Sequence, residues 1–258
     1  MSFQKLSLDG KVAVVIGGTT GIGRVISLGL AEAGADVIAS SRRHEQVAEV
    51  ARLIEAEGRR TLREVCDVAD RETLVKLRDA VLDKFGKVDI LVNSAGRTKR
   101  GKTLDFPEDE WNSIMDCNLT GTLRACQVFG DPMLKQNYGR IINIASLSTF
   151  AAFYEVAAYC ASKAAVGALT KSLAIEWGRD GVLVNAIAPG VFKTELNKDL
   201  LEGTGRGREI QMRTPLGRFG SIDELAGAAV FLASEAASFI NGEVLVVDGG
   251  FLASGVNQ

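Results

Sequence analysis

The chain has 258 residues, of which 47% are hydrophobic and 24% are charged, and its formal net charge at pH 7 is -2. This balance gives no basic surface for nucleic acid or for an acidic membrane, so we expect neither as a partner. His44 is the only histidine, and the four cysteines show no metal-ligand spacing, so we expect no metal site. Scattered cysteines and the lack of a long apolar run predict a cytoplasmic protein with reduced thiols.

Short runs rich in β-branched residues alternate along the chain with stretches of helical periodicity. Runs as apolar as "VAVVI" and "DILVN" must be covered on both faces, which implies a parallel sheet between two layers of helices. The pattern predicts an α/β fold, with a single doubly wound parallel sheet of Rossmann type in one domain over 1–258. About seven strands are expected, at 11–17, 35–40, 61–66, 88–93, 139–146, 182–188 and 243–250, with helices at 22–33, 44–57, 70–85, 108–136, 155–177 and 222–233.

The least regular region is 190–215, in which Gly203, Gly205 and Gly207 are expected between two short helical pieces. A segment of this kind beside the ends of the strands suits a lid over a bound ligand, and a long surface excursion is the alternative.

A glycine-rich turn, "IGGTTGIG" at 16–23, follows the first expected strand and opens the first helix. Gly17, Gly21 and Gly23 permit a tight turn and let the backbone approach a pyrophosphate, whose charge then meets the N–H groups at the start of the helix. In the first βαβ unit of a doubly wound sheet, this turn indicates a dinucleotide site.

The end of the second strand indicates which dinucleotide is bound. A carboxylate there would accept hydrogen bonds from an adenosine ribose, but this chain has Ser41 at that position and Arg42 beside it. A guanidinium prefers a phosphate, so NADP(H) is the favoured cofactor, with NAD(H) as the alternative. A second interpretation is that Arg42 and Arg43 only follow the end of the strand and are solvated, without binding a cofactor.

Tyr159 and Lys163 in "YCASK" are spaced i and i+4, which places both on one face of a helix. On spacing alone, a packed tyrosine beside a solvated lysine is the simpler interpretation. Ser146 lies 13 residues before Tyr159, at the end of the fifth expected strand. "NSAG" at 93–96 ends the fourth, and "APGVFKT" follows the sixth, so these elements meet at the edge where open α/β sheets bind ligands.

Taken in order, these motifs resemble the short-chain dehydrogenase/reductase family over essentially the whole chain. The resemblance implies that Tyr159 is the general acid/base. It implies that Lys163 and the positive charge of the nicotinamide lower the pKa of the phenol from about 10, and that Lys163 also holds the nicotinamide ribose. It also implies that Ser146 binds the substrate oxygen and that Asn118 holds a water in a proton relay. The cofactor-binding residues that it implies are Gly17, Thr19, Thr20, Gly21, Ile22, Gly23, Ser41, Arg42, Asp67, Val68, Asn93, Ala95, Gly96, Tyr159, Lys163, Pro189, Gly190 and Thr194.

The segment 96–111 looks like the gluconate 5-dehydrogenase branch of the family, in which a sugar acid or keto-sugar would be the substrate. Arg100 would then bind the substrate carboxylate, with a solvated loop charge as the alternative. A 3-oxoacyl carrier-protein reductase and a non-catalytic NADP-binding regulatory protein remain alternative functions. Relatives of this family are usually tetramers that pair the helices corresponding to 108–136 and 155–177, so a homotetramer built as a dimer of dimers is expected.

Overall fold

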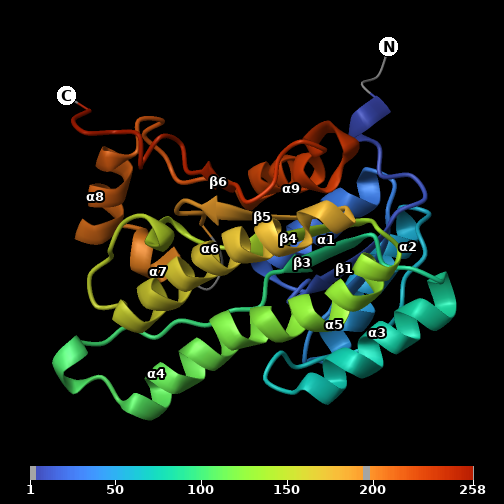
Figure 1. Cartoon of the computed structure of the whole chain (residues 1–258). Helices are drawn as coiled ribbons and strands as arrows, with labels where there is room; N and C mark the ends of the chain where they lie inside the picture. The colour runs from blue at the N-terminus through green and yellow to red at the C-terminus, as the bar shows by residue number, and fades with distance from the viewer. Residues whose placement is uncertain (1–3, 194–197, 258) are drawn as a thin grey trace.

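Six parallel strands form the centre of the computed structural model, which describes residues 4–193 and 198–257 (Figure 1). The strands lie side by side in the order β2-β1-β3-β4-β5-β6. From β1 the sheet is extended to one side by β2, and to the other side by β3 and the strands that follow it. All pairs are parallel, which confirms the expected doubly wound sheet. The strands are β1 (Val12–Ile16), β2 (Asp36–Ser40), β3 (Ile90–Asn93), β4 (Gly139–Ile144), β5 (Val182–Pro189) and β6 (Val244–Val247).

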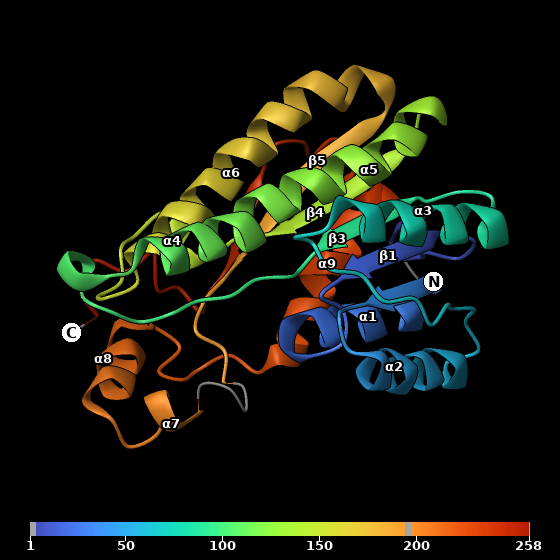
Figure 2. The same ribbon diagram turned by 90° about the horizontal axis from the view of Figure 1, so that it is seen from below.

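Helices cover both faces of the sheet, as Figure 2 shows from below. One face carries α1 (Gly21–Glu32), α2 (His44–Ala56) and α9 (Ala226–Ala233), and the other carries α3 (Arg71–Phe85), α5 (Gly121–Lys135) and α6 (Ala157–Trp177).

Alternation along the strands divides the core between the two faces. In β1, Ala13 and Val15 pack under α1, whereas Val12, Val14 and Ile16 pack under the helices of the other face. Every residue of β1 is buried, as expected for a strand covered on both sides.

The strand expected at 61–66 is not formed, which accounts for six strands in the described chain in place of about seven. Backbone hydrogen bonds join this segment to β2 only near its ends, from Val37 N–H to the carbonyl of Arg60 and from Cys66 N–H to the carbonyl of Ser41. Between them, the Ser40 hydroxyl donates to the carbonyl of Glu64 at 2.6 Å. A side chain therefore replaces the backbone bonds that a regular ladder would need.

The helix expected at 108–136 is divided in two by a wider turn. α4 (Glu108–Met115) ends where a π-helical turn, Asp116–Thr120, begins, and α5 follows from Gly121. Asn118 lies at the centre of this turn and is fully buried. Single π turns inside helices are frequent at functional sites.

The segment 190–215 contains two short helices, α7 (Lys198–Leu201) and α8 (Gly205–Arg213). Before them, Phe192 forms an isolated bridge with Gly220. Thr194, an expected cofactor residue, lies outside the described residues.

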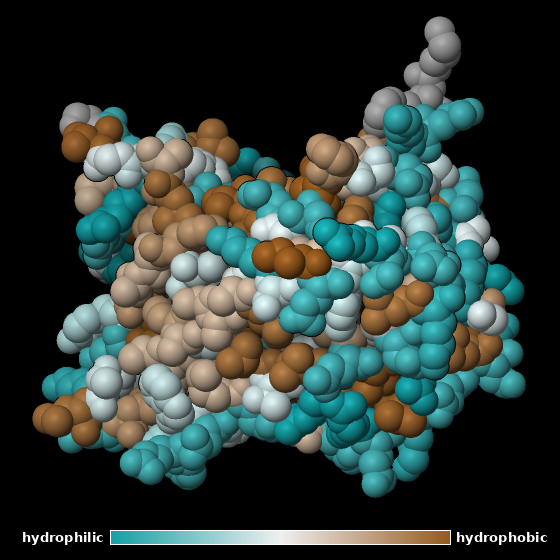
Figure 3. All heavy atoms as spheres, in the orientation of Figure 1, coloured by the Kyte–Doolittle hydropathy of each residue, from teal (hydrophilic) through white to brown (hydrophobic). Residues whose placement is uncertain are grey.

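The surface of α6 is unusually poor in charge for an exposed helix. Ala164, Ala168 and Ile175 are exposed along it, and Ile175 has 83% of its surface accessible. Figure 3 shows brown, apolar spheres gathered on this side of the molecule. Within the described residues, no helix combines the length and the apolar character that a membrane span requires.

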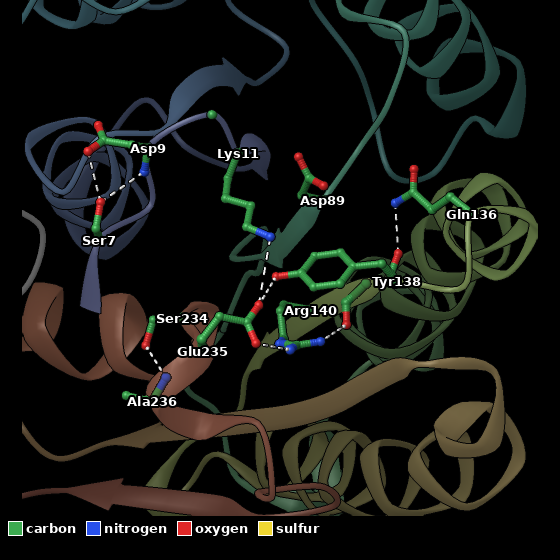
Figure 4. A network of polar contacts seen from close by, with 12 residues as sticks. Ser7, Asp9, Lys11, Asp89, Gln136, Tyr138, Arg140, Ser234, Glu235 and Ala236 are labelled. Atoms are coloured by element: carbon green, nitrogen blue, oxygen red, sulfur yellow. Dashed lines mark hydrogen bonds and ion pairs between the residues drawn. The ribbon is translucent and has the colours of Figure 1, made fainter. Parts of the chain in front are cut away.

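A polar cluster closes the amino ends of the strands, on the edge opposite the glycine turn (Figure 4). The ring of Tyr138 lies between two cations, with Lys11 Nζ 3.8 Å and the Arg140 guanidinium carbon 4.5 Å from its centre. Glu235 accepts a hydrogen bond from the Tyr138 hydroxyl at 2.9 Å and pairs with both cations. The cluster ties β1 and β4 to the segment that follows α9.

Candidate active site

The glycine turn lies at the carboxyl end of β1, beside the end of β3. Gly17 and Gly18 donate backbone hydrogen bonds to the carbonyl of Ser40, which joins the turn to β2. The φ of Gly17 is +76°, and a Cβ there would lie 2.6 Å from the backbone nitrogen of Ala95. Only glycine fits where the turn meets the end of β3.

The start of α1 presents open space to a ligand. Gly21 has a φ of +50°, and no described atom lies within 4 Å of the position that a Cβ would take. Thr20 has an extended backbone and makes no side-chain cap of the helix, so the first N–H groups of α1 are free to meet an anion. Thr20, Gly21, Ile22 and Gly23 thus have the geometry that a pyrophosphate needs.

The residues expected at the adenosine ribose lie together at the end of β2. The Thr19 hydroxyl donates to the Ser41 hydroxyl at 2.8 Å. Arg42 is 78% exposed, and its Nη1 lies 3.9 Å from the Asp67 carboxylate, a loose and solvated pair. Next to Asp67, Val68 is buried against Gly121. The structure therefore places Thr19, Ser41, Arg42, Asp67 and Val68 along one side of the glycine turn.

Asn93 faces inward at the end of β3. Its Nδ2 donates to Asn143 Oδ1 at 2.9 Å, and its own Oδ1 is buried without a partner among the described residues. A buried acceptor that lacks a donor is unusual and marks a place for a further polar group. Ala95 and Gly96 continue from here, and a Cβ on Gly96 would lie 3.7 Å from Lys163 Nζ.

Tyr159 and Ser146 come together from the first turn of α6 and from the end of β4. Their side chains form a hydrogen bond, which acts to lower the pKa of the Tyr159 phenol, but burial is the larger influence and raises that pKa. Lys163 Nζ lies over the tyrosine ring, 5.8 Å from its centre. The combined effect of Lys163 and a bound nicotinamide on the pKa of Tyr159 stays a prediction.

Lys163 is almost completely buried, with 5% of its surface accessible. Its ammonium donates to the main-chain carbonyl of Ile144 at 2.6 Å. Burial lowers the pKa of Lys163 to about 8. The lysine is thus held at the end of β4 and loses its proton at a lower pH than an ordinary lysine.

Asn118 is positioned by hydrogen bonds to the segment after β3 and to α6. Its Oδ1 accepts from the Arg97 N–H at 2.8 Å, and its Nδ2 donates to the Arg97 carbonyl at 2.9 Å and to the Ser162 hydroxyl at 3.0 Å. Ser162 in turn donates to the carbonyl of Tyr159 at 2.8 Å. The π turn thus connects to α6 through the buried amide of Asn118.

Pro189 and Gly190 end β5 on the same edge of the sheet. A Cβ on Gly190 would lie 2.6 Å from the Cα of Asp248, so this turn also requires glycine. A cavity of about 150 Å³ lies beside it, bounded by Val191, Thr214 and Asp248 among others. Neither Ser146 nor Tyr159 lines this cavity, so the cavity does not contain that pair.

Arg100 is half exposed and forms a hydrogen bond from Nε to the Glu155 carboxylate at 2.7 Å. Side-chain patterns in the sequence did not point to four further residues that contact the candidate site, Glu155, Arg97, Ser162 and Ile144. Arg97 and Ile144 act through backbone atoms, for which side-chain patterns give no signal. Ser162 lies inside the "YCASK" motif, which could have drawn attention to it.

The family model described as enoyl-(acyl carrier protein) reductase, a short-chain dehydrogenase/reductase model, matches residues 17–252. The chain belongs to the short-chain dehydrogenase/reductase family. It is 44% identical over 247 residues to the 2-dehydro-3-deoxy-D-gluconate 5-dehydrogenase of Bacillus subtilis, covering 96% of each chain. It is also 38% identical over 248 residues to the gluconate 5-dehydrogenase of Gluconobacter oxydans, covering 96% of this chain and 97% of that one.

A solved structure of the same family agrees closely with this fold. The gluconate 5-dehydrogenase of Burkholderia cenocepacia, in complex with NADP and tartrate, superposes with a TM-score of 0.94 at 39% identity, covering 97% of this chain and 98% of that one. The expected family is confirmed, and the protein is an oxidoreductase of the short-chain dehydrogenase/reductase type.

Proposed function

We propose that this short-chain dehydrogenase/reductase interconverts an alcohol and a carbonyl on a sugar acid or keto-sugar, with NADP(H) as the preferred cofactor. The observation that carries the proposal is the half-buried, hydrogen-bonded pair of Tyr159 and Ser146 beside Lys163, at the edge of the sheet that also holds the glycine turn. The relatives named for gluconate chemistry support the substrate class.

In this proposal, Ser146 donates a hydrogen bond to the substrate oxygen and Tyr159 exchanges a proton with it. The nicotinamide, when bound, supplies or accepts the hydride and carries a positive charge in its oxidised form. Burial raises the pKa of Tyr159, and the charge of the oxidised nicotinamide together with Lys163 would favour the phenolate against that effect. Lys163, with a water held by Asn118, would pass the proton onward from the tyrosine.

For the cofactor, Thr20, Gly21, Ile22 and Gly23 would hold the pyrophosphate at the start of α1. Ser41 and Arg42 would hold the 2′-phosphate, since Arg42 is exposed and only loosely paired. Relatives solved with NADP support this choice. Asp67 and Val68 would meet the adenine, and Asn93, Ala95, Gly96, Pro189, Gly190 and Thr194 would line the remainder. We further propose that 190–215 covers the site as a lid.

For the substrate, Arg100 would bind the carboxylate of the sugar acid. It lies on the segment that starts at Gly96, beside Lys163, and its guanidinium is half exposed. A planar guanidinium matches a carboxylate with two parallel hydrogen bonds.

The test is a panel of substrates measured with both cofactors. Gluconate, 5-ketogluconate, neutral polyols and an acetoacetyl thioester would each be supplied with NADP(H) and NAD(H), and kcat/KM compared. We expect the largest values for a sugar acid with NADP(H). A larger value for the thioester would instead favour the acyl carrier-protein reductase, and no turnover with any substrate would favour a non-catalytic NADP-binding protein.

We also propose a homotetramer, built as a dimer of dimers, that pairs α6 with α4 and α5. The support is the run of small and apolar exposed residues on α6, Ala164, Ala168 and Ile175. A location in the cytoplasm stays a prediction from the sequence.

A further inference from the structure

Glu155 has a backbone conformation that is unfavourable for a residue with a side chain. Its φ is +63°, in the left-handed region where glycine is preferred. Among the residues that the structure describes, Asn137 is the one other non-glycine residue with positive φ, and asparagine tolerates this region better than glutamate. Strained residues persist only where their surroundings hold them, and they gather at functional sites.

Two contacts hold Glu155 against one segment far away in the sequence. Its carbonyl accepts from the Gly101 N–H at 2.9 Å, and its carboxylate accepts from Arg100 Nε at 2.7 Å. The glutamate side chain is only 18% exposed, whereas that of Arg100 is 50% exposed. The pair is therefore shielded on the side of the glutamate and open on the side of the arginine.

The segment 96–101 runs along the catalytic helix between two anchored ends. At its start, Gly96 approaches Lys163, and the Arg97 backbone is bonded to Asn118. At its end it is bonded to Glu155, four residues before Tyr159. The segment thus flanks the tyrosine, and Glu155 determines where its far end lies.

We propose that Glu155 is a positioning residue that orients Arg100 for the carboxylate of the substrate, an inference that rests on the sugar-acid function proposed above. Nε of Arg100 is engaged by Glu155, and the guanidinium has no other partner among the described residues. Both terminal nitrogens stay available, and they form the fork that matches a carboxylate. A glycine at position 155 would relieve the backbone strain but could not hold the arginine, which explains why a strained glutamate occupies it.

The experiment compares Glu155→Gly, Glu155→Gln, Arg100→Ala and the double variant Glu155→Gly with Arg100→Ala. Glu155→Gly keeps the backbone bond to Gly101 and removes only the carboxylate, while Glu155→Gln keeps an acceptor oxygen without the charge. Lys99→Ala is the matched control, because Lys99 is the neighbouring cation, is 47% exposed and pairs with Glu110. The readouts are kcat, KM for gluconate and KM for NADP⁺.

We expect Glu155→Gly and Arg100→Ala each to raise KM for gluconate roughly tenfold, because a misplaced binding group loses much of its worth. KM for NADP⁺ and kcat should stay within about twofold. The double variant should be no worse than either single variant, since both remove one interaction. Glu155→Gln should lie between the wild type and Glu155→Gly, and Lys99→Ala should match the wild type.

Two results would overturn the proposed role of Glu155 and leave the proposed function intact. In one, the wild type uses gluconate, but Glu155→Gly leaves its KM unchanged or adds its effect to that of Arg100→Ala. In the other, Glu155→Gly impairs kcat and the KM for NADP⁺ to the same extent as the KM for gluconate, which would indicate general structural support. If the wild type uses no sugar acid, the proposed function is wrong and the inference falls with it.

Discussion

The ammonium of Lys163 donates a hydrogen bond to the main-chain carbonyl of Ile144, 2.6 Å away, and lies over the ring of Tyr159, whose centre is 5.8 Å from Nζ. The last carbonyl of β4 thereby holds the lysine at the edge of the sheet. The lysine and the tyrosine share a helix face, as their spacing predicts, yet they act on different partners. This separation lets substitutions of the two residues be distinguished.

Tyr159→Phe removes the proposed acid/base and leaves the ring in place. We expect kcat to fall roughly 10²- to 10⁴-fold with little change in cofactor affinity, because positioned acid/base catalysis is usually worth that much. Lys163→Ala should lower both kcat and the affinity for the cofactor. Steady-state kinetics and titration of NADPH fluorescence measure the two quantities, and a Phe variant with near-wild-type kcat would contradict the assignment.

The buried Lys163 should make stability depend on pH. Burial lowers its pKa from 10.5 to about 8, so between these values the unfolded chain binds more protons than the folded protein. The contribution of Lys163 to the free energy of unfolding should therefore rise with pH above about 8, by about 2 kcal/mol at pH 9.5, and be constant below that range.

Urea unfolding of the wild type and Lys163→Met at pH 7, 8 and 9.5 would measure this. The variant is the control, since it lacks the titrating group but retains the apolar stem. We expect the wild type to gain stability relative to the variant as the pH rises. If the free energies of unfolding of the wild type and the variant change with pH in the same way, Lys163 has an ordinary pKa.

Ser41 and Arg42 should set the choice of cofactor. Hydrogen bonds to a charged group are worth about 1.5–3 kcal/mol, so kcat/KM should favour NADP(H) roughly ten- to a hundredfold. Ser41→Asp with Arg42→Leu should reverse the order, because a carboxylate repels the phosphate and accepts from the ribose. Arg43→Leu tests the adjacent guanidinium. A wild type that prefers NAD(H) would disprove the placement of these residues at the ribose.

Glu235 should stabilise the cluster at the amino ends of the strands (Figure 4). Arg140 is only 4% exposed, and its one carboxylate partner in the described chain is Glu235, at 3.4 Å. Glu235→Gln would leave a buried charge uncompensated, and we expect a loss of about 1–3 kcal/mol in the free energy of unfolding. Glu243→Gln, an exposed carboxylate with no ion pair among the described residues, is the matched control. Equal stability of both variants in urea unfolding would show that the pair contributes nothing.

Ile175 should lie in a contact between subunits. It is 83% exposed on α6, and Ile175→Glu would place a charge in the proposed interface. We expect the wild type to be a tetramer in light scattering at micromolar concentration and the variant to form smaller species. Leu6→Glu, which alters another exposed apolar residue, should leave the assembly intact. A monomeric wild type would refute the proposed pairing.

Motifs and periodicity in the sequence were sufficient to predict the parallel sheet and the two helical layers. They also predicted that the segments expected to form the site lie at the carboxyl ends of the strands. Strands such as β1 are apolar throughout, so burial on both faces follows from hydrophobicity alone. The glycine turn could also be predicted from the sequence. Gly17 has a positive φ and a close backbone contact, and both exclude any side chain, so the position requires the glycine that the sequence shows.

Only the tertiary structure decided contacts that join distant segments or pass through the backbone. The strand expected at 61–66 fails because the Ser40 hydroxyl takes the place of a ladder bond, and no local pattern records that competition. The helix expected at 108–136 contains a π turn that bonds Asn118 to Arg97. The pKa of Tyr159 is raised because burial outweighs its hydrogen bond with Ser146, and desolvation depends on every neighbour in space. The pairing of Arg100 with Glu155 likewise spans 55 residues, and only the folded chain brings them together.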